Sequence, residues 1–415
     1  MLNVSSFNEC ESLAIDRDKF PMRLESGTPF LMPREFEFLS KNPLSTTLKD
    51  SPEDSLFKSE SLEKYFSKQT ELALARVNRM PNNAHVINNL GVSFLNSGDH
   101  ESALLWFEKA IEIDPNFVPS LANLAKTYLL KENFKEALNI YKRLEKIHPE
   151  DQDILNNIAH ILIMIKDLEP AKEYLRRVIK QDSNNAYALN NLGLVQLIEN
   201  NHNKALHYFR RAITIKSNLA SAYSNIGVCF ALRENYGKAI RFFRSSLSIE
   251  PLAVGTILNL AQAYQLKGNY QESVKLLSEY RETNPHNIRI AEFLAWSYFS
   301  LKDYHNSLRI LRNLVEKEKL NEDTAAKILN NIAVVYQCTK DDDLAEKYFN
   351  LCIDQKHART LLYFQNLICF YLDREKVDQA KKFIDLGLLE YPDDQTLMEC
   401  LGRYYFEVGK YEISL

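Results

Sequence analysis

The chain has 415 residues, with 51 Lys and Arg against 55 Asp and Glu and a formal net charge of −4. Because it has no basic excess, the composition argues against a phosphate-neutralising surface for nucleic acid. No apolar run approaches the roughly 18 residues of a membrane-spanning helix, and the N-terminus has no signal-peptide pattern. We therefore expect a cytoplasmic protein with protein or peptide partners, and the sequence leaves its oligomeric state open.

Residues 1–60 differ from the rest of the chain, because they hold five of the 13 prolines and 7 basic against 11 acidic residues. We expect a disordered N-terminal extension. Its apolar stretch between Phe20 and Leu39 either packs on the first helices or occupies a groove, and the sequence leaves both possibilities open. Residues 61–83 have a helical pattern that ends at Pro81, which predicts a capping helix for a repeat array.

Residues 84–117 introduce a pattern that returns every 34 residues almost to the C-terminus. The eighth position of each unit is small in nine of ten units: Gly91, Ala125, Ala159, Gly193, Gly227, Ala261, Ala295, Ala333, Ile368 and Gly402. Position 20 is also small: Ala103, Ala137, Ala171, Ala205, Ala239, Ser273, Ser307, Ala345 and Ala380. Position 24 is large and apolar: Phe107, Tyr141, Leu175, Phe209, Phe243, Leu277, Leu311, Phe349 and Ile384. Two closely packed helices per unit explain all three columns.

These columns, together with the proline that ends many units, resemble the tetratricopeptide repeat (TPR). The resemblance implies an all-α, right-handed superhelical solenoid of stacked helix-turn-helix repeats with a concave face. We expect nine repeats followed by a partial tenth at 395–415: 84–117, 118–151, 152–185, 186–219, 220–253, 254–287, 288–325, 326–360 and 361–394. The seventh is four residues longer than the others, with the excess around 316–324, and we expect a longer second helix or loop there.

Asparagine occupies position six of the first helix in eight of nine repeats: Asn89, Asn123, Asn157, Asn191, Asn225, Asn259, Asn331 and Asn366. Helix propensity does not favour asparagine, and position six lies off the packed stripe. A carboxamide column could hold an extended peptide backbone, as in the similar superhelical region of O-linked N-acetylglucosamine transferases, whose catalytic region has no counterpart here. The alternative is a structural role in which each asparagine bonds a neighbouring repeat.

The seventh repeat interrupts this column, because Phe293 stands at position six. Arg289, Trp296 and Phe299 lie on the same predicted helix face. An aromatic cluster beside an arginine could select one side chain of a partner, so these four residues form a candidate anchor pocket. They could equally pack against the lengthened connection.

The sequence contains no phosphate-cradling glycine loop, zinc-protease motif or nucleophile elbow, and its nine histidines are scattered. Asp341, Asp342 and Asp343 precede a predicted helix, where Asp343 and Glu346 have the spacing of a capping box. Six cysteines without a CxxC pair fit a reducing compartment. We expect no cofactor, no metal site and no catalytic residues.

The sequence thus predicts a non-enzymatic scaffold or adaptor that binds an extended segment of a partner protein in a concave groove. Two alternatives stay open. One is an assembly factor for a pilus, a secretion system or another multiprotein machine, and the other is a targeting subunit of a separately encoded enzyme.

Overall fold

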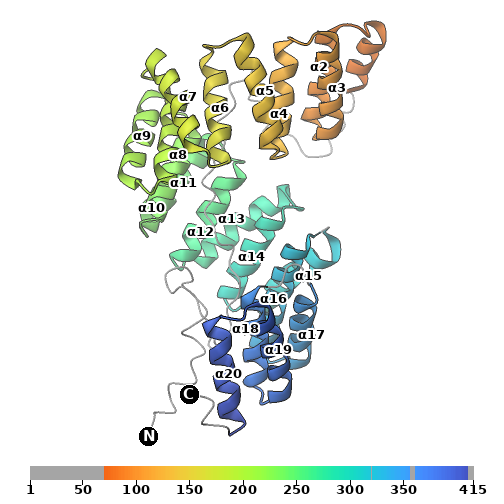
Figure 1. The fold of residues 1–415 in the computed structure, drawn as a ribbon, viewed down its shortest axis with the longest axis vertical. Coiled ribbons are helices and arrows are strands. Elements are labelled where there is room, and N and C mark those ends of the chain that lie inside the picture. The colour runs from red at the N-terminus through yellow and green to blue at the C-terminus, as the bar shows by residue number, and fades with distance from the viewer. Residues whose placement is uncertain (1–69, 319, 356–359, 410–415) are drawn as a thin grey trace. The chain divides into compact units, whose positions relative to one another are not determined.

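The computed structural model describes residues 70–318, 320–355 and 360–409, and all regular secondary structure in these ranges is helical (Figure 1). The N-terminal extension predicted for 1–60 and the beginning of the predicted capping helix lie outside the described residues. Within 61–83, residues 70–79 are helical. The final residues of the chain, 410–415, also lie outside the described ranges.

The helices follow one another in pairs, one pair for each predicted repeat. The pairs are α2 (Ala84–Asn96) with α3 (His100–Ile113), α4 (Val118–Leu130) with α5 (Phe134–Ile147), α6 (Gln152–Met164) with α7 (Leu168–Gln181), α8 (Ala186–Ile198) with α9 (His202–Ile215), and α10 (Ala220–Ala231) with α11 (Tyr236–Ile249). They continue with α12 (Val254–Leu266) and α13 (Tyr270–Thr283), α14 (Ile288–Ser300) and α15 (Tyr304–Lys317), α16 (Glu322–Cys338) and α17 (Asp342–Ile353), α18 (Leu361–Leu372) and α19 (Val377–Glu390), and a last first helix, α20 (Gln395–Glu407).

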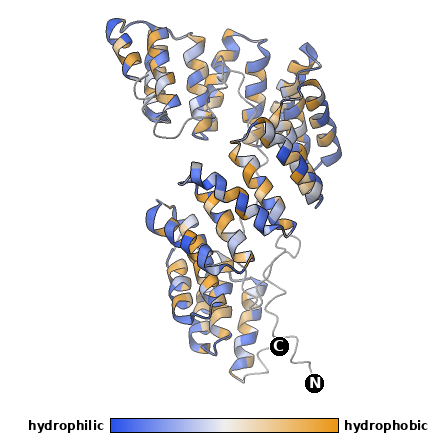
Figure 2. Cartoon of the chain, turned by 180° about the vertical axis from the view of Figure 1, so that it is seen from behind, coloured by the Kyte–Doolittle hydropathy of each residue, from blue (hydrophilic) through white to orange (hydrophobic). Residues whose placement is uncertain are grey.

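The described helices form two compact units. One unit contains α2 to α10, the other contains α12 to α20, and α11 is divided between them. Inside each unit consecutive helices pack on one another, and several first helices also pack on the next first helix, as α6 does on α8. Most helices carry hydrophobic and hydrophilic residues together, which fits helices that bury one side (Figure 2).

The turn inside each helix pair uses the same backbone conformation in every repeat. The fifteenth position has a positive φ, between 57° and 81°, in ten successive turns: Gly98, Glu132, Lys166, Asn200, Glu234, Gly268, Lys302, Lys340, Glu375 and Gly409. The next amide donates back across the turn to a carbonyl near the helix end, as Asp167 N does to Leu162 O at 2.8 Å. This is the left-handed helix ending that favours glycine, yet seven turns adopt it with another residue.

The columns of small and large residues meet inside each helix pair, as the sequence predicts. Phe107, Phe209 and Leu311 at position 24 are fully buried, and so are the small residues at position 20. The contact is closest in repeats 1 and 4, where a Cβ on Gly91 or Gly193 would lie 2.6 or 2.4 Å from the ring of the repeat's own phenylalanine. Glycine is therefore required at these two sites by the size of its partner.

The four-residue excess after repeat 7 is an additional turn of helix, and the expectation of a longer second helix or loop is wrong. Helix α15 has 14 residues, like most second helices, whereas the first helix α16 has 17 and begins at Glu322. Asn321 caps it by accepting a hydrogen bond from Thr324 N at 2.8 Å, and Glu322 and Asp323 lie in its first turn. A cap followed by two acidic residues favours this early start.

Candidate functional site

The asparagine column lies along the first helices, and most of its side chains are buried and not exposed to solvent. Asn89, in the first repeat, is exposed. The seven others are buried, with exposed fractions between 0 and 6%: Asn123, Asn157, Asn191, Asn225, Asn259, Asn331 and Asn366. At these seven positions the carboxamides lie within the packed structure, and peptide binding by the column stays a prediction.

Four of the buried asparagines bond the preceding repeat. In each case the side-chain N–H at position six donates to the asparagine carbonyl oxygen at position five of the repeat before. The four bonds are Asn123 to Asn88 at 3.0 Å, Asn191 to Asn156 at 2.9 Å, Asn225 to Asn190 at 3.0 Å and Asn366 to Asn330 at 2.8 Å. We call these four pairs the polar seam. They give the column the structural role that the sequence left as an alternative.

The same register explains an asparagine that does not join the seam. Position five of repeat 2 is Ala122, which has no acceptor, and Asn157 instead donates to the hydroxyl of Tyr141 at 3.2 Å. Burial raises the pKa of Tyr141, so its hydroxyl stays protonated. Where the preceding repeat lacks an acceptor at position five, the carboxamide finds one on that repeat's second helix.

The register also accounts for the break in the column at Phe293. Position five of the preceding repeat is Leu258, and both side chains are buried, at 0 and 2% exposure. An asparagine here would face an apolar residue, so the pair is apolar on both sides. Position five of repeat 7 is Glu292, whose buried carboxylate pairs with Lys327 of the next repeat at 2.8 Å. Repeats 6 and 7 thus replace the position-five asparagine by Leu258 and Glu292.

Three of the four candidate anchor residues are buried. Arg289 is exposed, but Phe293, Trp296 and Phe299 are at most 8% exposed. Trp296 packs edge-on against Tyr270 of the preceding second helix, with ring centroids 5.6 Å apart. This burial fits the alternative in which the aromatic residues pack inside the array, and selection of a partner by this cluster remains a prediction.

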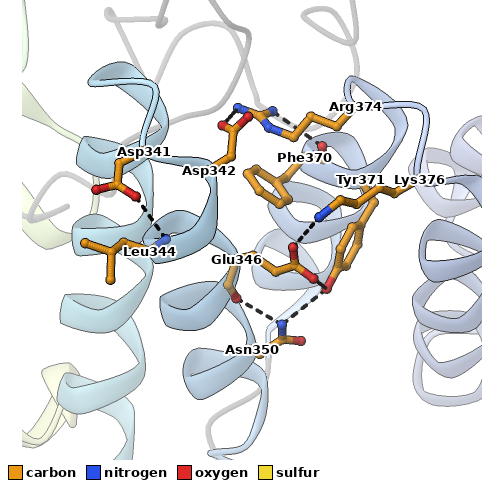
Figure 3. A network of polar contacts seen from close by, with 9 residues as sticks. All are labelled: Asp341, Asp342, Leu344, Glu346, Asn350, Phe370, Tyr371, Arg374 and Lys376. Carbon is orange, nitrogen blue, oxygen red and sulfur yellow. Dashed lines mark hydrogen bonds and ion pairs between the residues drawn. The ribbon is translucent and has the colours of Figure 1, made fainter.

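The acidic run before α17 is a helix start and an inter-repeat clamp (Figure 3). Asp341 caps α17 through Leu344 N at 3.2 Å, so the capping residue is Asp341 and not Asp343 as the spacing predicts. Asp342 pairs with Arg374, and Glu346 accepts from Lys376 and from the Tyr371 hydroxyl. Arg374 lowers the pKa of the Asp342 carboxyl. These carboxylates already have cationic partners from repeat 9.

Metal-ligating side chains do not gather into a site in the described part of the chain. Its residues contain no group of three His, Cys, Asp or Glu placed to hold a metal, and none of its helices is long and apolar enough to cross a membrane. Five of the six cysteines lie in it, and these five form no disulfide with one another. Burial raises the pKa of Cys229 to about 12 and also raises that of Cys352, so both stay protonated and unreactive at neutral pH.

Family models described as tetratricopeptide repeat match residues 84–117, 106–139, 128–192, 167–220 and 230–297. These matches fall on the helix pairs whose small and large columns meet in the structure. The chain is a tetratricopeptide repeat protein. Such repeats generally mediate protein–protein interactions and are typically non-catalytic, and the TPR solenoid here has the periodicity that the sequence predicts.

Solved structures agree with this fold at low sequence identity. A monomeric IFIT1 mutant with Gppp-AAAA is 13% identical, with a TM-score of 0.51 over 84% of this TPR chain and 93% of that chain. The APC/C hetero-tetramer Cut9–Hcn1 is 14% identical, with a TM-score of 0.49 over 77% and 76%. PilW, a type IV pilus biogenesis factor, is 17% identical, with a TM-score of 0.41 over 50% and 96%. No curated protein sequence matches significantly.

Proposed function

We propose that this TPR protein is a non-enzymatic scaffold that holds an extended segment of a partner protein along its first helices. The observation that carries the proposal is the regular column of carboxamides along those helices, of which the polar seam is a part. Neighbouring packed helices lie about 8–10 Å apart and an extended chain advances about 3.3–3.6 Å per residue. Each repeat therefore meets about three residues of a bound segment, which lets carboxamides pair with the backbone at regular intervals.

The inter-repeat bonds leave capacity for such pairing. A carboxamide has two N–H groups and a carbonyl oxygen, and the seam uses one N–H of Asn123 and one of Asn366. On the same helix face, the described residues give no hydrogen-bond partner to Gln262 Oε1 or to Gln365 Nε2, although both atoms are buried. A buried polar atom without a partner costs about 1–3 kcal/mol, which a bound peptide backbone would recover by local opening of the face.

The test separates binding from stability. Linear peptides are first selected from a displayed random library against the full chain, and their affinities are measured by fluorescence anisotropy. The variant Asn157→Ala, Asn191→Ala, Asn225→Ala should bind at least about tenfold more weakly, which corresponds to about 1.4 kcal/mol. It should also unfold more easily, since it removes three inter-repeat hydrogen bonds.

A matched variant, Asn156→Leu with Asn191→Leu, removes both members of one seam pair, so neither carboxamide of that pair is left without the other. It should keep nearly the wild-type denaturation midpoint, because replacing both partners by apolar groups of similar shape is close to neutral. Loss of peptide affinity in this stable variant supports the proposal. Wild-type affinity in it, or failure of the library to yield any peptide, overturns the proposal and leaves the seam a purely structural device.

A further inference from the structure

A pocket of about 500 Å³ lies between α13, α14 and α15, and residues of the second helices of repeats 6 and 7 line it. A pocket of about 550 Å³ occurs between repeats 1 and 2. Eight of the nine residues that line the second pocket have their counterparts, exactly five repeats further along the chain, in the first. The same pocket therefore occurs at two inter-repeat boundaries. We call the groove between the second helices of neighbouring repeats the outer groove. The charge and size of each pocket depend on the residues at the equivalent positions.

In three earlier repeats an arginine at position 26 spans this groove. Arg143 donates to Pro115 O at 3.0 Å, Arg177 to Pro149 O at 2.7 Å and Arg211 to Ser183 O at 3.3 Å. The corresponding residue of repeat 7 is Asn313, which is shorter and uncharged and lines the pocket. The groove between α13 and α15 therefore lacks the arginine that crosses the equivalent groove in repeats 2, 3 and 4.

The charges are also reversed. Arg177 pairs with Glu145 at 2.7 Å, but the counterpart of Glu145 between repeats 6 and 7 is Arg281. Burial, and next the charge of Arg309, lower the pKa of the Arg281 guanidinium. No carboxylate among the described residues pairs with either arginine. Two like charges that share a pocket without a counterion favour an added anion.

The remaining charged residues of the pocket do not supply that counterion. Lys317 adds a third cation, whereas Glu282 and Glu318 also line the pocket. Glu318 lies 3.0 Å from His286 Nδ1. Glu282 follows Arg281 on the same helix and forms no ion pair with it in the described structure.

We propose that this pocket binds an oxyanion side chain, a carboxylate or a phosphate monoester, on a partner polypeptide, with Arg281 and Arg309 as its counterions. A polypeptide fits better than a free anion because Leu294, Ile310 and Leu314 give the pocket an apolar floor that a flanking side chain can cover. The site lies on the outer groove and goes beyond the function proposed for the first-helix face, so either can fail without the other.

The test uses the full chain and three pools of labelled degenerate peptides, whose central residue is fixed as Glu, phosphoserine or Gln and is followed by Leu. Anisotropy should show that the Glu or the phosphoserine pool binds at least about tenfold more tightly than the Gln pool. Whichever acidic pool binds more tightly identifies the source of the oxyanion. Calorimetry with inorganic phosphate alone serves as the free-anion arm.

Arg281→Glu introduces the residue type of its counterpart in repeat 2, Glu145, and places a carboxylate near Arg309. It should retain the wild-type denaturation midpoint and abolish the preference for acidic peptides. Arg309→Gln should weaken the preference without adding a negative charge. The control Arg210→Glu makes the same change of net charge as Arg281→Glu on an exposed part of α9 and should bind like wild type.

Three results would overturn the proposal: equal binding of all three pools by the wild-type chain, an acidic preference that survives Arg281→Glu, or equal loss in Arg210→Glu. Binding of inorganic phosphate without any peptide preference would assign the pocket to a free anion and would also reject the polypeptide. If Arg281→Glu does not fold, the decision passes to Arg309→Gln, whose side chain is exposed.

Discussion

Repeats 4 and 7 each consist of two helices of the same lengths, but position six holds a polar residue in repeat 4 and an apolar residue in repeat 7. Repeat 4 joins repeat 3 through Asn191 and Asn156, and in repeat 7 the same positions hold Phe293 and, in the preceding repeat, Leu258. In repeat 4, Arg211 crosses the outer groove to Ser183 of repeat 3. In repeat 7 the equivalent residue is Asn313, which lines a pocket. The comparison shows that the packing at position six depends on position five of the preceding repeat: Asn191 bonds Asn156, whereas Phe293 follows a repeat with Leu258.

The largest expected effect comes from introducing the asparagine of repeat 4 at position six of repeat 7 without changing Leu258 in the preceding repeat. Phe293→Asn removes a fully buried ring and places a carboxamide opposite Leu258, so it should destabilise the C-terminal unit by about 3–5 kcal/mol. Urea denaturation followed by circular dichroism measures this loss. Adding Leu258→Asn should recover part of the stability by restoring an Asn–Asn pair. A double variant that is no more stable than the single one would show that positions 258 and 293 are not coupled.

The opposite exchange in repeat 4 should have a smaller effect. Asn191→Leu leaves the Asn156 carbonyl oxygen buried without its donor, at a cost of about 1–3 kcal/mol. The double variant Asn156→Leu, Asn191→Leu should return close to wild-type stability. Denaturation midpoints of the two variants check this, and additive losses in the double variant would contradict it, because coupled partners are expected to be non-additive.

The two repeats also differ inside the helix pair. Repeat 4 combines Gly193 with Phe209, whereas repeat 7 combines Ala295 with Leu311. Gly193→Ala would bring a Cβ within 2.4 Å of the phenylalanine ring, so the ring must move, and we expect a loss of about 1–3 kcal/mol. Adding Phe209→Leu should relieve the clash. Calorimetric melting of both variants measures the difference, and a fully tolerated Gly193→Ala would show that the ring moves freely.

The sequence was sufficient for the architecture because a 34-residue period fixes the helix pairs and their packed faces. Helices α2, α4, α6, α8, α10, α12 and α14 begin at the first residue of their predicted repeats. The added turn of α16 was not foreseen, because four extra residues between two helices can lengthen either one or the loop. The cap at Asn321 decides the outcome only once its hydrogen bond is seen.

The candidate site was harder to predict because the residues at position six alone do not show which residues of the preceding repeat they bond. Reading position six together with position five of the preceding repeat would have paired Asn156 with Asn191 and Leu258 with Phe293. The outer pocket was missed for a similar reason: Arg281 is an ordinary helix-end arginine until Asn313 and Arg309 are placed beside it. Such relations join residues of different repeats, and periodicity within one repeat does not contain them.

The smallest expected effect concerns the turn that the repeats share. Lys166 has a φ of 63°, whereas repeat 1 has Gly98 with a φ of 81° at the same position. A left-handed conformation costs a non-glycine residue roughly 1–2 kcal/mol, partly offset because glycine has more freedom to lose on folding. Lys166→Gly should therefore stabilise the chain by up to about 1 kcal/mol, measured as a higher urea midpoint. The control is Gly98→Lys, which should lower the midpoint by a similar amount. Both positions are exposed and neither glycine nor lysine packs against another element there, so a loss of stability in Lys166→Gly would show that the lysine side chain contributes more than its backbone strain costs.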